Sequence, residues 1–258
     1  MKTVLLLDID GVLCEAQQPI SDRMRSAITS ASFIHDIVLV TGNTFTKSVD
    51  LINWHGFAGI FCNNGDELRD KFGYCVWRDT ETPPLPDGLG TCLERSSTGS
   101  RKGNNSIEWR SPRFVNYSYI GRYATKEQRQ AHIEEYKKPY GDWRDTFMPE
   151  LRDLTPFGKD IEIVRGGAVS VDIYSKGADK ARAAKYLNEC DQRFIFIGDK
   201  TALGGNDYPI IKYCEQNPQI ENKCFTSNGP SNTLELLEQV LRANEDPLSH
   251  APRTNRGI

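Results

Sequence analysis

The stretch Val4-Leu5-Leu6-Leu7-Asp8-Ile9-Asp10-Gly11-Val12-Leu13 decides the fold, because it joins a short apolar run directly to two carboxylates. A continuous apolar run of this kind is typical of a strand buried on both faces, as in parallel sheets. Asp8 and Asp10 follow at the carboxyl end of that strand, where open α/β sheets place their chemistry. Gly11 permits a sharp backbone turn after them. An ordinary turn is the alternative interpretation, but the buried strand before it favours a functional site.

Alternating helices and strands continue the pattern. A helix capped by Ser21 is expected next, with three apolar residues spaced along it: Met24, Ile28 and Phe33. Buried strands are predicted at Ile37–Val40 and Gly59–Cys62, with a helix between them. The second strand runs into Thr41-Gly42-Asn43. This order of elements predicts an α/β fold with a doubly wound, Rossmann-like parallel sheet.

The pattern changes in the middle of the chain. The segment 80–105 is rich in Pro, Gly, Ser and Thr, and we interpret it as a boundary or a solvated loop. After it, short strands that alternate apolar and polar residues mix with amphipathic segments. The strands are Ile107–Trp109, Val115–Ile120, Ile161–Val164 and Val169–Ile173, and the helices are Thr125–Tyr136 and Trp143–Leu154. The middle of the chain is therefore predicted to be an inserted α+β cap.

The α/β pattern then resumes with a helix from Lys180 and the buried strand Phe194–Ile197, which ends at Gly198-Asp199. A helix over Asn232–Ala243 closes the fold, and the polar residues beyond it are expected to be disordered. The predicted division is core 1–81, cap 82–175, core 176–245 and flexible tail 246–258.

Composition narrows the classes of function. Of 258 residues, 38% are hydrophobic and 26% charged, and the net charge is −3, so neither nucleic acid nor an anionic membrane is an expected partner. No apolar run is long enough for a membrane span, and Met1-Lys2 leads into the strand without a secretory signal. The seven cysteines form no CxxC pair, and the four histidines are dispersed. We expect a cytoplasmic protein whose chemistry comes from carboxylates and cations.

Four separate motifs are expected at one edge of the predicted sheet. Asp8 is a candidate nucleophile that would form an aspartyl-phosphate, and Asp10 a candidate general acid and base. Thr41-Gly42 and Lys180 could bind and neutralise the phosphoryl group. Mg²⁺ suits such a site, since it binds one or two carboxylates together with phosphate oxygens, and Asp199 is the natural additional ligand.

These residues give the chain a resemblance to a known family. It resembles the haloacid-dehalogenase (HAD) phosphotransferases, and within them the eukaryotic-type phosphomannomutases. The resemblance rests on the following stretches: Asp8-Ile9-Asp10-Gly11, Asn116–Arg122, Arg129, Gly166–Asp172, Gly177–Lys180, Gly198–Thr201 and Gly204–Asp207. It covers nearly the whole chain except about 78–105 and the last fifteen or so residues. The cap motifs are more specific to the phosphomannomutases than the Asp-x-Asp-Gly motif is.

The resemblance implies roles for individual residues. Arg122 and Arg129 match cap arginines that hold the phosphate of the sugar that does not react, and a guanidinium fork suits such a dianion. Ser170 and Asp172 match residues that bind sugar hydroxyls. Arg110 is similar to a further phosphate-binding arginine, although Arg113 could serve instead. The metal would be Mg²⁺ held by Asp8, Asp199 and the backbone carbonyl of Asp10, and a hexose bisphosphate could act as activator.

The implied reaction interconverts hexose 6-phosphate and hexose 1-phosphate, with mannose as the expected sugar, as in mannose metabolism leading to GDP-mannose. The chain also departs from the family. Gln17 stands in place of an arginine, Thr41-Gly42-Asn43 replaces Gly-Gly-Ser, the pattern for an extra cation is missing, and the cap helix that builds the family's homodimer is altered. Gln17 and Thr41 favour a Mg²⁺-dependent sugar-phosphate phosphatase as the alternative, and the other departures argue against dimerisation and strict mutase behaviour. A non-catalytic sugar-phosphate sensor is a third hypothesis, which the intact aspartates oppose.

Overall fold

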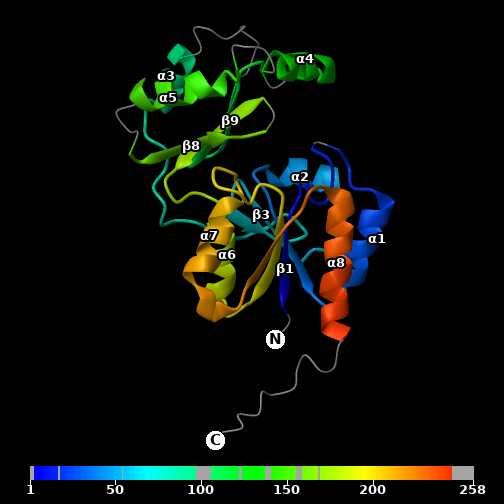
Figure 1. The fold of residues 1–258 in the computed structure, drawn as a ribbon. Coiled ribbons are helices and arrows are strands. Elements are labelled where there is room, and N and C mark those ends of the chain that lie inside the picture. Colours follow the sequence, from blue (N-terminus) through cyan, green and yellow to red (C-terminus); the bar gives the residue numbers. More distant parts are fainter. Residues whose placement is uncertain are drawn as a thin grey trace, which may run out of the picture.

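The fold is seen in a computed structural model that describes residues 3–16, 18–53, 55–96, 106–121, 124–136, 141–154, 159–167 and 169–245. It contains two sheets, one above the other in Figure 1. We call the seven-stranded sheet with its flanking helices the core, and the four-stranded sheet with its helices the cap. Gln17, Arg122 and the predicted tail 246–258 lie outside the described residues.

The core sheet has the order β11-β10-β1-β2-β3-β4-β5. The first five of these strands are parallel, and β4 and β5 are antiparallel additions at one edge. The strands are β1 (Val4–Asp8), β2 (Asp36–Val40), β3 (Gly59–Cys62), β4 (Glu67–Arg69), β5 (Cys75–Arg78), β10 (Phe194–Gly198) and β11 (Lys223–Thr226). All five residues of β1 are buried. The predicted buried parallel strand is therefore confirmed, and it lies between β10 and β2.

Helices cover both faces of the core sheet, as Figure 1 shows, with α1 and α8 on one side and α6 and α7 on the other. They are α1 (Asp22–Ser32), α2 (Phe45–Ile52), α6 (Ala181–Glu189), α7 (Tyr208–Gln216) and α8 (Pro230–Glu245), with a short 3₁₀ turn at Pro218–Ile220. Leu5 and Leu7 pack into the cluster beneath α1 and α8, and Leu6 packs on the other face beneath α6. Alternate residues of β1 thus serve the two layers of a doubly wound fold.

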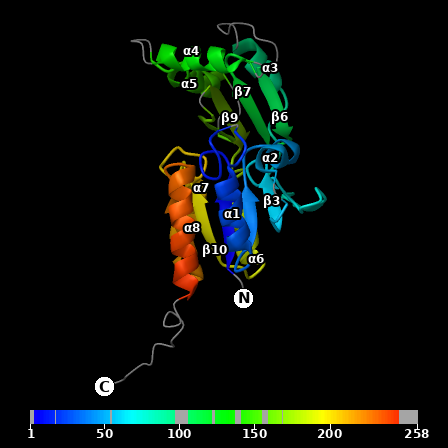
Figure 2. The ribbon, with the colours of Figure 1, turned by 90° about the vertical axis from the view of Figure 1, so that its right-hand side faces the viewer.

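The cap sheet is antiparallel, in the order β6-β7-β9-β8. Its elements are α3 (Leu89–Ser96), β6 (Ile107–Ser111), β7 (Phe114–Ser118), α4 (Lys126–Tyr136), α5 (Arg144–Leu154), β8 (Ile161–Arg165) and β9 (Ser170–Ser175). Thr125 and Gln128 form the predicted capping box of α4, each side chain accepting from the other's backbone N–H. In Figure 2 the cap lies above the core, with its helices on the side away from the core. The α/β core with an inserted α+β cap agrees with the predicted fold class.

Parts of the sequence-based prediction were wrong. The expected loop 80–105 contains the helix α3, because Leu89 and Leu93, four residues apart, are fully buried against the cap sheet. Phe33 is 80% exposed, and Ala31 takes the expected buried position on α1. Strands β4, β5 and β11 and helix α7 were not predicted. The three strands are short, and polar residues interrupt the apolar pattern of α7.

Alternating apolar and polar residues in Val115–Ile120 predict a half-buried strand, but the strand observed there, β7, is buried on both faces, as is β9. Their apolar face, which includes Val115 and Val171, packs into the cap's own core. Their polar face, which includes Asn116 and Asp172, is turned to a cavity above the core. The polar side chains of β7 and β9 therefore line the cavity and do not form an exposed surface.

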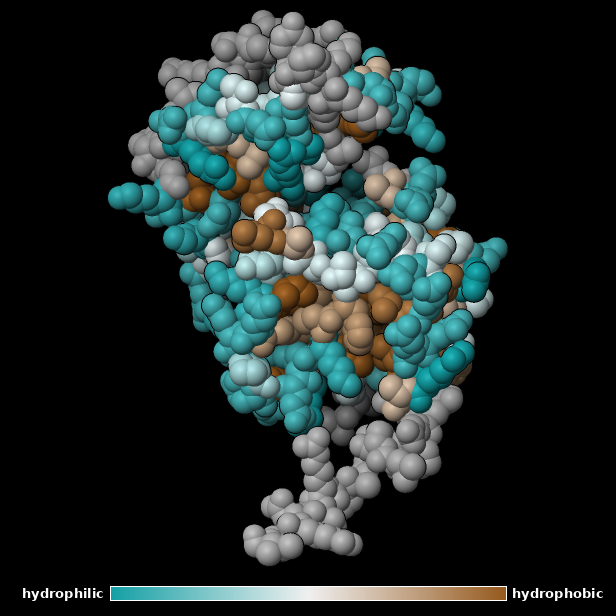
Figure 3. Space-filling model, viewed as in Figure 1, coloured by the Kyte–Doolittle hydropathy of each residue, from teal (hydrophilic) through white to brown (hydrophobic). Residues whose placement is uncertain are grey.

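Hydrophilic side chains cover most of the face shown in Figure 3, while apolar ones gather between α7 and α8, over the open edge at β11. Within the described part of the chain, no helix is both long and apolar enough to cross a membrane.

Replacing Leu93 by alanine tests whether α3 belongs to the cap's packed core. Leu93 is fully buried, so Leu93→Ala should lower the free energy of unfolding by about 2–5 kcal/mol. Thr91→Ala, at an exposed position of the same helix, should change it by less than about 0.5 kcal/mol. Chemical denaturation of both variants measures the difference. Equal effects would contradict the packing of α3.

Candidate active site

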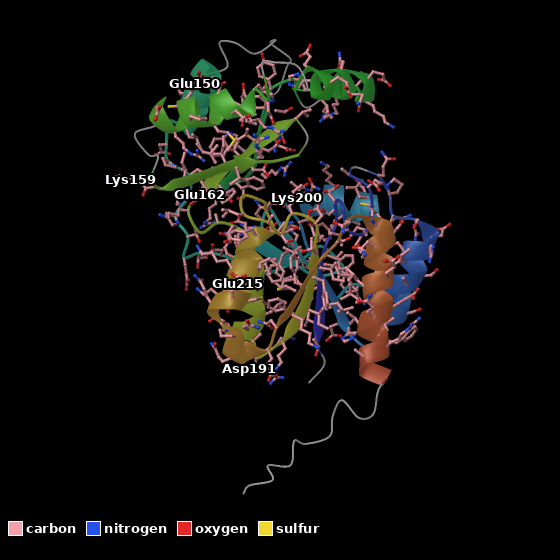
Figure 4. All side chains as sticks on the ribbon, in the orientation of Figure 1. Glu150, Lys159, Glu162, Asp191, Lys200 and Glu215 are labelled. Atoms are coloured by element: carbon pink, nitrogen blue, oxygen red, sulfur yellow. The ribbon has the colours of Figure 1, made fainter. Side chains whose placement is uncertain are left out.

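A cavity of about 970 Å³ lies between the carboxyl edge of the core sheet and the cap. From the core it is lined by Asp8, Asp10 and Thr41-Gly42-Asn43, among others. From the cap it is lined by residues that include Arg129 and Ser170. In Figure 4, Lys200 marks the core edge that faces the cap, and Asp191 marks the opposite edge of the core. The cavity thus brings together predicted site residues that are far apart in the sequence.

Lys180 pairs with two carboxylates at the carboxyl edge of the core sheet. It immediately precedes α6 and is fully buried, and its Nζ lies 2.8 Å from Asp8 Oδ1 and 2.7 Å from Asp207 Oδ1. The other oxygen of Asp207 accepts hydrogen bonds from the backbone N–H groups of Asp199 and Lys200, at 3.0 and 3.1 Å. Asp207 therefore holds both Lys180 and the turn after β10 in place.

Burial and charge act in opposite directions in this cluster. Burial raises the pKa of Asp8 to about 7, despite the opposing charge of Lys180, and Asp207 and Asp199 add repulsion. Burial works to lower the pKa of Lys180, but Asp207 and Asp8 outweigh it and raise that pKa. Burial would likewise raise the pKa of Asp207, but Lys180 and the backbone donors bring it below its usual value. Lys180 thus mainly neutralises the charge of Asp207, and a negative charge on Asp8 is only partly compensated.

The carboxylates at this edge fit a divalent cation. Oxygens of Asp8, Asp199 and Asp207 lie within 4.8 Å of one another. Asp199 Oδ1 is buried and has no hydrogen-bond partner among the described residues, and burial raises the pKa of this carboxyl. Both oxygens of Asp207 are already engaged, so Asp8 and Asp199 are the better candidates for direct ligands. Oxygen ligands of this charge suit Mg²⁺.

Gly11 is required for the close approach of Asp199. Its φ is +82°, and a Cβ atom at this position would overlap Asp199 Oδ2. Only glycine adopts this backbone conformation without strain and leaves room for the carboxylate. The Gly of the Asp-x-Asp-Gly motif thus has a second role beyond the turn.

The polar residues after β2 support the two aspartates. Thr41 is buried, and its Oγ1 accepts a hydrogen bond from Asn43 N at 3.0 Å. Asn43 Nδ2 donates to Asp10 Oδ2 at 2.7 Å. Asp10 is itself partly exposed at the cavity, in contrast to the buried Asp8. The two aspartates therefore occupy environments suited to different tasks.

The cap contributes a second polar surface. Ser170 and Asp172 lie on the same face of β9 and both line the cavity. Ser170 Oγ accepts from Gly167 N at 2.9 Å, and Asp172 Oδ1 accepts from Asn116 Nδ2 at 2.5 Å. A side chain at Gly166 would crowd both residues, since its Cβ would lie 2.8 Å from Ser170 Oγ and 2.9 Å from Asp172 Oδ1.

The arginines of the cap differ in where they lie. Arg110 lines the cavity and donates to Gly42 O at 2.6 Å, which links the cap to the core. Arg113 is bonded instead to Thr82 O and lies 3.3 Å from Asp66, away from the cavity. Arg129 lines the cavity from α4, and Arg122 lies outside the described residues. Of these two arginines, Arg110 is the one that lines the cavity.

Several site residues were not assigned a role from the sequence. Asp207 had a signal, since it ends the Gly204-Gly205-Asn206-Asp207 stretch, but nothing in the sequence indicated its partner Lys180. The side chains of Asn43 and Asn116 donate to Asp10 and Asp172, and no sequence pattern reveals these contacts. Arg144 lines the cavity, and its Nη2 lies 2.6 Å from Asp142 Oδ2. Its place at the start of α5 did not indicate a role in the site.

Comparison with solved structures defines the class of fold. The C-terminal domain of a trehalose-6-phosphate phosphatase from C. albicans matches with a TM-score of 0.66 at 16% identity, covering 93% of this chain and 91% of that one. A phosphatase of the HAD superfamily from Bacteroides thetaiotaomicron matches with a TM-score of 0.54 at 17% identity, covering 93% and 95%. The fold is that of a capped HAD-superfamily protein.

The sequence comparisons place the chain within that class. The family model of the eukaryotic phosphomannomutases matches residues 97–243. A probable phosphomannomutase of Caenorhabditis elegans is 28% identical over 256 residues, which cover 93% of this chain and 96% of the relative. The chain belongs to the eukaryotic phosphomannomutase family. It is therefore an enzyme, a phosphotransferase.

The raised pKa of Asp8 predicts that Mg²⁺ binding depends on pH. Because the folded protein protonates this carboxyl more readily than the unfolded chain does, the metal-free protein should gain stability from Asp8 as the pH falls through about 7. Mg²⁺ must displace that proton, so its affinity should be roughly tenfold weaker at pH 6 than at pH 8. Calorimetric titration at both pH values measures this, with Asp199→Asn as the variant expected to lose binding. Equal affinities at the two pH values would contradict the assignment.

Proposed function

We propose that this enzyme interconverts hexose 6-phosphate and hexose 1-phosphate, with mannose as the sugar, through a phosphoryl group carried on Asp8. The observation that carries the proposal is the position of Asp8, paired with the buried Lys180, at the floor of a cavity whose roof is the polar face of the cap. One side of the cavity suits the reacting phosphate, and the other suits the rest of a sugar phosphate.

On the core side, each residue has a distinct task in phosphoryl transfer. Asp8 attacks phosphorus, and Lys180 offsets the charge that the phosphoryl group brings. Asp10 gives a proton to the departing sugar oxygen and later takes one from the attacking oxygen. Thr41 and the backbone of Gly42 bind phosphoryl oxygens. Mg²⁺, when held by Asp8, Asp199 and the carbonyl of Asp10, supplies the positive charge that offsets the repulsion between phosphate and carboxylates.

On the cap side, the residues recognise the rest of the substrate. Arg129 and Arg110, together with Arg122, bind the phosphate that does not react. Asp172 accepts hydrogen bonds from sugar hydroxyls, and the hydroxyl of Ser170 donates to or accepts from them. Holding the bisphosphate intermediate between two such surfaces allows it to turn around and return either phosphate to the core. A hexose bisphosphate would therefore act as activator.

The alternative is a sugar-phosphate phosphatase, in which water attacks the phosphate on Asp8. Thr41-Gly42-Asn43 in place of the family's Gly-Gly-Ser favours it, as does Gln17 in place of an arginine. Both reactions share the first step, so they differ only in the acceptor of the phosphoryl group.

Incubation with mannose 1-phosphate, Mg²⁺ and a trace of hexose 1,6-bisphosphate separates the two reactions. We expect mannose 6-phosphate as the main product, measured by ³¹P NMR, and no product with Asp8→Asn. Stoichiometric release of inorganic phosphate without any 6-phosphate would contradict the mutase and support the phosphatase.

Removing the guanidinium of Arg129 tests the role of the cap. Arg129→Ala should lower kcat/KM for mannose 1-phosphate by roughly 10–100-fold, because a charge-assisted hydrogen bond to the phosphate contributes about 1.5–3 kcal/mol. Mannose 1-phosphate places its phosphate at the cap while its 6-oxygen takes the phosphoryl group from Asp8. The loss should be far smaller for phenyl phosphate, whose only phosphate must react at Asp8 and leaves none for the cap. Arg193→Ala, at the opposite edge of the core, serves as the matched control and should change neither value. An equal loss with both substrates would count against the assigned role.

A further inference from the structure

Asn43 lies in direct contact with the carboxylate that serves as acid and base in the proposed function. Its side chain is buried, and Nδ2 donates to Asp10 Oδ2 at 2.7 Å. No motif assigned a role to this residue, which lies two positions after Thr41, at the end of β2. The contact joins the loops that follow two neighbouring parallel strands, β1 and β2.

The chemistry of this hydrogen bond distinguishes the two oxygens of Asp10. An amide nitrogen only donates, so Asp10 Oδ2 must be the acceptor. A proton on Oδ2 would face the amide hydrogens, so the transferable proton belongs on Oδ1. The amide thus fixes both the rotation of the carboxyl group and the oxygen that exchanges the proton.

Asn43 is well placed to act as a rigid support. Its backbone N–H is bound by Thr41 Oγ1 at 3.0 Å, and its carbonyl accepts from Asn63 N at 3.0 Å. Both backbone contacts persist when the side chain is changed. Asn43 and Asp10 also both belong to the core, so their contact does not depend on the position of the cap.

We infer that Asn43 is a positioning residue, which holds Asp10 so that Oδ1 delivers the proton to the leaving oxygen. The inference rests on the proposed function, since it requires that Asp8 takes the phosphoryl group and Asp10 protonates the leaving group. Asn43 acts through Asp10 and need not touch the substrate. Its loss should therefore matter only when the leaving group needs a proton.

Two aryl phosphates of different leaving ability test this directly in the Mg²⁺-loaded enzyme. Phenol leaves poorly without a proton, whereas dinitrophenolate leaves as the anion. In rapid-mixing experiments, the burst of released phenol reports the formation of phospho-Asp8. Asn43→Ala should slow the burst with phenyl phosphate by roughly tenfold, part of the 10²–10⁴-fold that general acid catalysis contributes. The burst with dinitrophenyl phosphate should change by less than about twofold, because no general acid is needed there.

A second comparison separates positioning from a structural role. If Asn43 acts through Asp10, adding Asn43→Ala to Asp10→Asn should cause no further loss with phenyl phosphate. Asn43→Ser, whose side chain is too short to reach Oδ2, should behave as Asn43→Ala and replaces it if the alanine variant does not fold. Asn188→Ala is the matched control, because that amide binds Gln192 O and Asn222 at the opposite edge of the core.

The outcomes are distinct. Equal slowing with both aryl phosphates, or additive losses in the double variant, would overturn the inference while leaving the proposed function intact. Release of dinitrophenolate by Asp8→Asn at the rate of the unmodified enzyme would overturn the proposed function and this inference with it.

Discussion

The buried ammonium group of Lys180 is the constraint on which the rest of the site depends. A fully buried cation is tolerated only when it is paired, and here two carboxylates approach it to within 2.7 and 2.8 Å. These contacts hold together the end of β1, the start of α6 and, through Asp207, the start of α7. Asp207 also orients the turn that carries Asp199. One charge therefore fixes the relative positions of three segments that are far apart in the sequence.

The division of the molecule into core and cap follows from this arrangement. The core edge gathers three carboxylates around one cation, and this surplus of negative charge favours the binding of a divalent metal ion. Burial, with added repulsion from Asp207 and Asp199, raises the pKa of Asp8. The cap gathers arginines, Ser170 and Asp172 over the same cavity. In the function that we propose, a substrate with a phosphate at one end and a polar sugar at the other would contact both surfaces.

Sequence reasoning succeeded where a pattern is local. The apolar run before Asp8 identified the central strand, and the strand-end positions of Thr41 and Asp199 predicted correctly that both residues lie at the carboxyl edge of the parallel strands. It failed where tertiary contacts decide. Leu89 and Leu93 form a buried helical stripe within a segment whose composition is typical of a loop. The contacts of Asp207 with Lys180 and of Asn43 with Asp10 join residues 27 and 33 positions apart, which no spacing reveals. The sequence likewise does not show that Arg110, at the bulge in β6, contacts the core through Gly42 O.

The central claim is that Asp8 carries the phosphoryl group. Its most direct test is to quench the Mg²⁺-loaded enzyme with acid during turnover of mannose 1-phosphate, and to locate the bound phosphate by mass spectrometry of the proteolytic peptides. We expect phosphate on the peptide that contains Asp8, localised to that residue and absent from Asp8→Asn. Phosphate on another residue, or turnover without any phosphorylated peptide, would contradict the account.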